Sequence, residues 1–214
     1  MQLIIGNKNY SSWSLRPWIF MRTFKMDFEE VRIPLYNNEA VTRLSGYFSG
    51  GKVPVLVDGD RVIWDSLAIL EYLSETYLAG KGWPDDPGKR ACARSISAEM
   101  HASFQSLRSE LPMNCRRNSA SKPVSGEVQR DIDRIMSIWE KCRSANSGNG
   151  AWLFGTYSIA DAMYAPVVLR FDTYGVPLTG MLQEYGRHVL QQPELQEWIE
   201  AARSEPEVLA KFEV

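Results

Sequence analysis

The stretch NYSSWSLRPW, residues 9–18, places several hydroxyl groups where a short apolar segment gives way to a helical pattern. Serine at such a junction usually caps the helix, because its side-chain oxygen accepts a hydrogen bond from a free backbone amide. Pro17 has no amide hydrogen and suits a first turn, so we expect the helix to begin near Ser14, with Ser14 as its cap. Ser11 and Ser12 would then lie free in the preceding loop, where a hydroxyl beside a helix N-terminus can hold an anion or a thiolate.

Composition narrows the function classes. The chain has 214 residues, 44% of them hydrophobic, and a formal net charge of −2 without any basic block, which argues against a nucleic-acid partner. The first residues lack the basic and apolar regions of a signal peptide, and no segment approaches membrane-spanning length, so we expect a soluble cytoplasmic protein without a membrane partner. Cys92, Cys115 and Cys142 include no C-x-x-C pair, so neither a disulfide framework nor a metal site is expected.

The first third of the chain alternates strand and helix patterns. Period-two and period-three-to-four spacing of apolar residues predicts an α/β unit that ends near residue 78. Its expected elements are a strand at 3–6, a helix at 14–25, a strand at 28–35, an irregular stretch, a hairpin of strands at 53–57 and 61–64 around DGD, and a helix at 65–77.

The rest of the chain shows only helical periods. Residues 79–88 are rich in Gly, Pro and Asp and read as a linker that ends at Asp86 and Pro87, an N-cap followed by proline at the first helical position. Residues 89–214 are predicted to form an all-helical domain. Within it, Ser158 and Asp161 have the spacing of a capping box.

Several short motifs together resemble the cytosolic glutathione S-transferase family over nearly the whole chain: GKVPVL, WDSLAILEYL, the linker WPDDP and SIADA. The resemblance implies a thioredoxin-like N-terminal domain at 1–78 followed by the helical domain. It also implies glutathione as co-substrate, a cytoplasmic homodimer and a role in detoxification. SSWSLR is most similar to the zeta-class pattern serine-serine-cysteine-x-x-arginine, with Trp13 in the place of the cysteine. The hydroxyls are therefore left as candidates to activate the thiol.

Glutathione is an extended anionic tripeptide, and the first domain offers groups suited to it. The resemblance implies a cis bond between Val53 and Pro54 that exposes the Val53 backbone to the cysteinyl residue; an ordinary strand-opening proline is the alternative. Ser66 and the following amides suit the γ-glutamyl carboxylate, and Asp65 suits its ammonium, although both also fit a plain helix cap. Lys52 is expected to reach the glycyl carboxylate, and an ordinary surface lysine is the alternative.

In the second domain, the run AEMHASFQSLRSELPMN at 98–114 carries the candidate acceptor site. Its apolar stripe includes Phe104, while His101 and Arg108 share an adjoining face and are two turns apart on one predicted helix. The alternative is that His101 is a structural histidine with its hydrogen bonds satisfied, and that Arg108 forms an ion pair between the two domains. Tyr157, Tyr164 and Arg170 are further candidates for the same cleft. In the zeta pattern, an arginine that binds the substrate carboxylate falls near position 173. This chain has Thr173 there, and its arginine is at position 170, which disfavours maleylacetoacetate isomerase activity.

These observations favour a glutathione transferase that activates the thiol for attack on a small electrophile, by conjugation or by isomerisation. By resemblance to the zeta pattern the main activating role falls on Ser11, with Ser12 second and Tyr10 third, while Trp13 is expected to contact the substrates. For Ser11 and Ser12, the alternative is that both hydroxyls only form hydrogen bonds with backbone groups of the loop. A binding or regulatory protein with the same fold and no turnover is the alternative for the whole chain.

Overall fold

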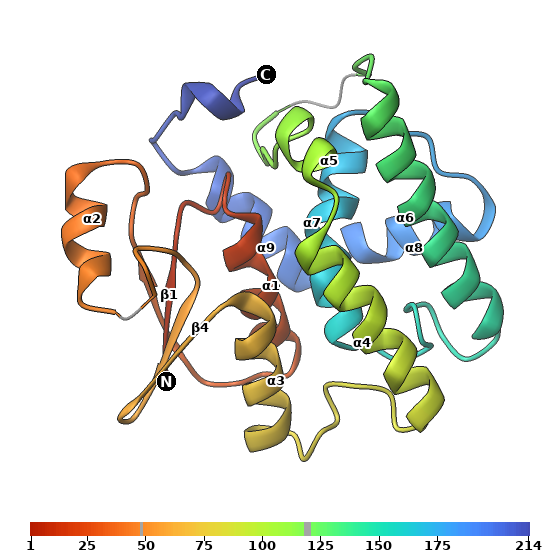
Figure 1. Ribbon diagram of the computed structural model, residues 1–214, viewed down its shortest axis with the longest axis horizontal. Helices are drawn as coiled ribbons and strands as arrows, with labels where there is room; N and C mark the ends of the chain where they lie inside the picture. The colour runs from red at the N-terminus through yellow and green to blue at the C-terminus, as the bar shows by residue number, and fades with distance from the viewer. Residues whose placement is uncertain (48, 118–120) are drawn as a thin grey trace.

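The computed structural model describes residues 1–47, 49–117 and 121–214 and begins with a small mixed sheet (Figure 1). The strand order is β2-β1-β3-β4. β1 runs parallel to β2 and antiparallel to β3, and β3 and β4 form a hairpin in which Gly59 has a φ of 57°, in the left-handed region. The strand bounds are Gln2–Ile5 for β1, Glu29–Arg32 for β2, Val55–Asp58 for β3 and Arg61–Trp64 for β4.

Two helices cover one face of this sheet and one covers the other (Figure 1). α1 (Ser12–Thr23) crosses from β1 to the parallel strand β2, and α3 (Ser66–Tyr77) follows the hairpin. Both lie between the sheet and the later helices, and α1 packs on both α3 and α7. The N-terminus of α1 is thereby held where the sheet layer meets the helical layer.

The stretch between β2 and β3, which the sequence predicts to be irregular, contains a helix. α2 (Asn38–Ser45) lies on the opposite face of the sheet from α1. Its N-cap Asn37 accepts a hydrogen bond from the Ala40 amide at 2.7 Å. Ala40 and Leu44 are buried against a small apolar cluster with Ile4 and others. Only Ala40 and Leu44 of its eight residues are buried. Two apolar positions four residues apart are too weak a pattern to predict a helix from spacing.

The remaining chain is helical, as predicted. α7 lies at the centre and is buried nearly all round, which explains its largely apolar sequence. Asp86 caps α4 by accepting the Lys89 amide at 2.8 Å, as predicted, and the capping box of Ser158 and Asp161 is present at α7. The bounds are Pro87–Ala102 for α4, Gln105–Glu110 for α5, Gly126–Ala145 for α6, Ile159–Thr173 for α7, Gly180–Leu190 for α8, Pro193–Arg203 for α9 and Ala210–Phe212 for the short 3₁₀ helix η1.

The structure breaks the helix predicted to carry both His101 and Arg108. α4 ends at Ala102, Phe104 adopts a left-handed φ of 65°, and α5 begins at the next residue. Arg108 stabilises this break, because its Nε donates to the Ser103 carbonyl at 3.1 Å and its Nη2 donates to the Met100 carbonyl. The guanidinium thus satisfies carbonyls that a helix end leaves free.

None of the helices that the structure describes combines the length and the apolar character needed to cross a bilayer. The division of the chain at residues 78 and 89 stays a prediction.

Candidate functional site

Helix α1 begins earlier than the sequence predicts, because Ser11 and not Ser14 is its N-cap. The Ser11 hydroxyl oxygen accepts the Ser14 amide at 3.4 Å and donates its proton to the Ser14 hydroxyl oxygen at 2.8 Å. Ser14 Oγ also accepts the Gly6 amide at 3.1 Å, which ties the helix to the end of β1. The prediction of Ser14 as cap is therefore wrong. Pro17 lies beyond the first turn, where its missing amide removes the bond to the Trp13 carbonyl.

Ser12, the first residue of α1, is joined to a buried cation. Its Oγ accepts a hydrogen bond at 3.2 Å from Nη2 of Arg170, which comes from α7. The other donors of Arg170 bind the Leu111 carbonyl at 2.8 Å and the Pro166 carbonyl at 3.4 Å, so all these partners are neutral. Burial, followed by the charge of Arg108, lowers the pKa of Arg170 to about 9. The structure thus brings a positive charge to the serine pair.

The other two candidates on or beside α7, Tyr164 and Tyr157, lie away from the N-terminus of α1. Tyr164 donates to the Ile96 carbonyl at 3.2 Å inside the helical layer. Tyr157 packs against Phe24, at the C-terminal end of α1, and against Trp152. Only Arg170 of the three lies at the N-terminus of α1.

Arg16 adds a second fully buried guanidinium one turn into α1. Its Nε donates to the Met163 carbonyl at 3.3 Å and its Nη1 lies 3.5 Å from Ser66 Oγ. Burial, followed by the like charges of Arg108 and Arg170, lowers its pKa well below the ordinary value. The three arginines therefore act on one another electrostatically at one helix N-terminus, with carbonyl and hydroxyl oxygens as their hydrogen-bond partners.

Trp13 lies against three polar side chains, Arg16, Arg108 and His101, which we call the Trp13 cluster. The guanidinium carbons of Arg16 and Arg108 lie 4.3 and 4.6 Å from the centre of its indole, within cation–π range. The His101 ring meets the indole edge-on, with 5.2 Å between ring centroids. The residue in the place of the zeta-class cysteine is therefore a contact between the two layers.

Asp65 and Ser66 occupy the start of α3, as predicted. One carboxylate oxygen of Asp65 caps the helix by accepting the Leu67 amide at 2.9 Å, and the other lies 3.1 Å from His101 Nε2. Asp65 has a φ of 74°. The structure thereby brings together a predicted residue from each domain. Burial is the main cause that lowers the pKa of His101, the charges of Arg16 and Arg108 lower it further, and Asp65 opposes them.

The predicted cis peptide bond between Val53 and Pro54 is present at the start of β3. Val53 packs against the small cluster on the α2 side of the sheet, while Lys52 beside it is exposed. Phe104 is buried at the break between α4 and α5. The roles of these residues toward a ligand stay predictions.

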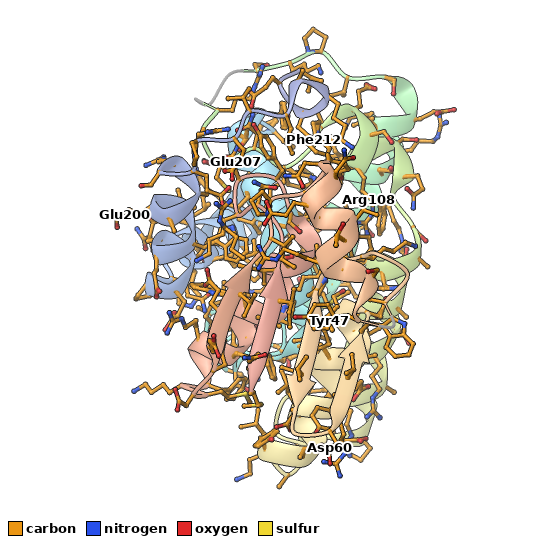
Figure 2. The ribbon with its side chains drawn as sticks, turned by 90° about the vertical axis from the view of Figure 1, so that its left-hand side faces the viewer. Tyr47, Asp60, Arg108, Glu200, Glu207 and Phe212 are labelled. Atoms are coloured by element: carbon orange, nitrogen blue, oxygen red, sulfur yellow. The ribbon has the colours of Figure 1, made fainter. Side chains whose placement is uncertain are left out.

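The hydroxyl of Tyr10 is fully engaged by the C-terminal segment. It donates to Glu213 Oε1 at 2.5 Å and accepts from Arg116 Nη2 at 2.7 Å and from the Leu209 amide at 3.1 Å. The Tyr10 ring stacks on Phe212 with 5.3 Å between centroids. Figure 2 shows Phe212 and Arg108 toward the same end of the molecule, opposite the β3–β4 turn at Asp60. The C-terminal segment therefore holds the loop that leads into α1.

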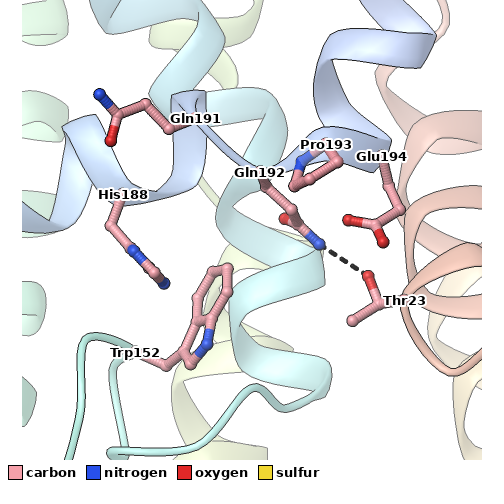
Figure 3. A pocket seen from close by; sticks show the side chains of 7 residues that line it. All are labelled: Thr23, Trp152, His188, Gln191, Gln192, Pro193 and Glu194. Atoms are coloured by element: carbon pink, nitrogen blue, oxygen red, sulfur yellow. Dashed lines mark hydrogen bonds between the residues drawn. The ribbon is translucent and has the colours of Figure 1, made fainter.

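A cavity of about 390 Å³ lies elsewhere, beside the C-terminal end of α1 and the junction of α8 and α9 (Figure 3). Gln192 donates to Thr23 Oγ1 at 2.6 Å there, and His188 meets the Trp152 ring edge-on. None of the predicted site residues lines it. Within the described ranges, no three His, Cys, Asp or Glu side chains gather as metal ligands do.

Sequence reasoning missed Arg16 as a site residue and left Arg170 as one of several candidates. Arg16 stands at the arginine of the serine-serine-x-x-x-arginine pattern, so a signal for it was present. Arg170 had no comparable signal, because only the packing of α7 on α1 brings it to Ser12.

Comparisons with known proteins identify the family of the chain. Residues 10–76 match the family model for the glutathione S-transferase N-terminal domain, and residues 124–201 match that for the C-terminal domain. The chain belongs to the glutathione S-transferase family. A zeta-class glutathione S-transferase of Euphorbia esula is 31% identical over 160 residues, which cover 74% of this chain and 71% of that one.

Two further relatives add detail. A probable maleylacetoacetate isomerase of Caenorhabditis elegans is 39% identical over 97 residues, 45% of either chain. A glutathione transferase homologue from Burkholderia, solved with bound glutathione, has a TM-score of 0.71 at 21% identity and covers 95% of this chain and 98% of its own. The predicted family, its zeta-like relatives and the fold, a thioredoxin-like domain followed by helices, are confirmed. The comparisons support glutathione-dependent transferase or isomerase function.

Proposed function

We propose that this glutathione S-transferase activates the glutathione thiol at the N-terminus of α1, with Ser12 as the hydroxyl donor and Arg170 behind it. The thiolate then attacks a small electrophile, either to form a conjugate or to add reversibly to a double bond and isomerise it. The observation that carries this proposal is the hydrogen bond from the buried Arg170 guanidinium to Ser12 Oγ.

Electrostatics at this place favours a thiolate over a thiol. The N-terminus of a helix carries a partial positive charge, and Arg16, Arg108 and Arg170 add three guanidiniums whose hydrogen-bond partners are neutral. A thiol has a reference pKa of about 8.5, which nearby cations lower. We therefore expect glutathione bound here to be substantially ionised at neutral pH.

The hydrogen-bond directions favour Ser12 over Ser11 as the donor to sulfur. The Ser11 proton is used within the cap, toward Ser14. Ser12 Oγ accepts a hydrogen bond from Arg170, so its own hydroxyl proton can point toward a ligand. Tyr10 is engaged by Glu213 and so is the weakest of the three candidates. The remaining glutathione contacts keep their predicted places: the Val53 backbone for the cysteinyl residue, Lys52 for the glycyl carboxylate, and Asp65 and Ser66 for the γ-glutamyl group.

Titration of the bound thiol by thiolate absorbance tests the assignment. We expect Ser12→Ala and Arg170→Gln each to raise the pKa of bound glutathione by about one unit, because each removes a charge-assisted interaction. Conjugation at neutral pH should fall by about twofold to fivefold in parallel, because a thiol that is largely ionised in the wild-type protein loses less than tenfold of its thiolate. Ser11→Ala and Tyr10→Phe should leave the pKa unchanged.

The outcomes separate the alternatives. If Ser11→Ala alone raises the pKa, the main role returns to Ser11, as the zeta pattern suggests. If glutathione binds with no turnover of any electrophile in a broad screen, the chain is a binding or regulatory protein instead.

We also propose that the protein works in the cytoplasm as a homodimer in detoxification. This rests on family membership. Light scattering that gives a monomer across micromolar concentrations would contradict the dimer.

A further inference from the structure

Two of the three cysteines meet inside the helical domain. Cys92 comes from α4 and Cys142 from α6, both are free, and both side chains pack in the same apolar core. The Cys92 thiol acts on the Cys142 thiol through its charge and through a hydrogen bond between the two side chains, so the sulfur atoms are neighbours. The two residues are far apart in the sequence, and only the packing of the helices makes them a pair.

The register of α4 against α6 accounts for this contact. The two helices lie side by side and run in opposite directions (Figure 1). The Arg134 guanidinium joins them by two hydrogen bonds, of 2.7 and 2.8 Å, to the Glu99 carboxylate. Cys92 precedes Glu99 by seven residues, and Cys142 follows Arg134 by eight. At about 1.5 Å per residue these steps are about 10 and 12 Å long, so both cysteines lie at the same level of the helix pair.

The surroundings of the two sulfur atoms differ. Cys92 is half-buried, so a small solute can reach its side chain, whereas Cys142 is only 3% exposed. Burial, followed by the charge and the hydrogen bond of Cys92, raises the pKa of Cys142 to about 12. Cys142 therefore keeps its proton at neutral pH and does not meet solvent. Cys92 is the sulfur that an oxidant reaches first, and Cys142 is placed to react with it afterwards.

We propose that Cys92 and Cys142 are an oxidation site, at which hydrogen peroxide forms a reversible disulfide between α4 and α6. The Cys92 sulfur attacks one peroxide oxygen, the O–O bond breaks, and a sulfenic acid and water form. The Cys142 sulfur then attacks the Cys92 sulfur, the S–O bond breaks, and the departing hydroxide takes the Cys142 proton as water. Two thiols and one peroxide thus give one disulfide and two waters, and both electrons pass to the peroxide.

A dithiol reductant reverses the reaction by thiol–disulfide exchange and is itself oxidised to a disulfide. The site stands apart from the proposed function, which uses no cysteine of the chain. A failure of one proposal therefore leaves the other intact.

Mass spectrometry of the wild-type protein after treatment with hydrogen peroxide is the first test. We expect the chain to lose two hydrogen atoms, the free thiols of the denatured protein to fall from three to one, and a crosslinked peptide pair to contain Cys92 and Cys142. A dithiol reductant should restore all three thiols. Gain of oxygen atoms without a crosslink, a crosslink that includes Cys115, or a crosslink between two chains would overturn the inference.

Single substitutions separate the two roles. Cys142→Ala leaves the Cys92 sulfenic acid without its partner, so it should bind about tenfold more of the sulfenic-acid reagent dimedone than the wild-type protein does. Cys92→Ser should leave the buried Cys142 thiol reduced. Equal dimedone labelling of Cys142→Ala and wild-type protein would show that Cys142 does not react with oxidised Cys92, and would contradict the proposed order of steps.

The third cysteine provides a matched control. Cys115 is also buried, but its Sγ donates to the Lys8 carbonyl at 3.8 Å, beside the end of β1. Cys115→Ala should therefore form the disulfide as readily as the wild-type protein. Loss of the disulfide in this variant would show that the oxidised pair is not Cys92 and Cys142.

Thermal unfolding gives a second measurement on the wild-type protein. A bond between α4 and α6 restricts the unfolded chain, so the oxidised protein should melt about 5 °C above the reduced protein. The difference should vanish in Cys92→Ser. A lower melting temperature after oxidation would show that the observed packing of the two helices does not accommodate the bond, and the inference would fail.

Discussion

The N-termini of α1 and α7 are both buried and both capped by serine, yet they differ in the charge that surrounds them. At α7, Asp161 accepts the Ser158 amide at 2.9 Å, the Leu153 amide at 3.0 Å and the Tyr185 hydroxyl at 3.3 Å. At α1 the first turn holds no acidic residue, and guanidiniums surround it.

The difference separates a structural helix end from a reactive one. The α7 terminus supplies its own anion, so its amides and neighbouring donors are satisfied within the chain. The first turn of α1 collects positive charge and holds no acidic residue of its own, with Asp65 of α3 as a carboxylate that acts on Arg16, so a ligand that brings an anion is stabilised there. The same cap chemistry thus serves stability in one place and binding in the other.

The largest effect is expected at the structural terminus. Asp161→Ala leaves the buried donors of Ser158, Leu153 and Tyr185 without an acceptor, and we expect the free energy of unfolding to fall by about 4 kcal/mol. Urea denaturation measures the change. A loss below about 1 kcal/mol would show that water replaces the carboxylate. The N-termini of α7 and α1 would then not differ in the way described above.

The same carboxyl group makes stability depend on pH. Burial raises the pKa of Asp161 from its ordinary 3.8 to about 6, so the folded protein binds this proton more tightly than the unfolded chain does. The protonated Asp161 carboxyl group gives its full stabilisation below the pKa that it has in the unfolded chain. This stabilisation is lost as pH rises through about 6. We expect the free energy of unfolding, relative to Asp161→Asn, to decline by up to roughly 3 kcal/mol between about pH 4 and pH 7. A difference that is flat with pH would contradict the raised pKa.

The smallest effects are expected from the caps themselves. Ser158→Ala and Ser11→Ala each remove a cap hydrogen bond, so each should cost about 1 kcal/mol in thermal unfolding. Glutathione affinity should be unchanged in both, because neither hydroxyl is assigned to sulfur. If Ser11→Ala also impairs glutathione binding, cap and thiol site at α1 are not separable.

The sequence by itself determined the architecture and the places of several helix caps. Period-two strands, the cap at Asp86 and the capping box of Ser158 and Asp161 are local patterns, and each is present in the structure. The motif GKVPVL located the cis bond before Pro54 through its resemblance to a known family. Local spacing failed where it was weak, as at α2, or where several serines competed for one cap, as at Ser11 and Ser14.

Only the tertiary structure decided how the charges are arranged. His101 and Arg108 lie on separate helices, because Phe104 turns the chain between them, and Arg170 reaches Ser12 only through the packing of α7 on α1. These contacts join residues that are far apart in sequence, and no periodicity encodes them. Whether a buried guanidinium meets a carboxylate, a carbonyl or an indole depends on side chains from other elements, so the positive N-terminus of α1 could be seen only in the folded chain.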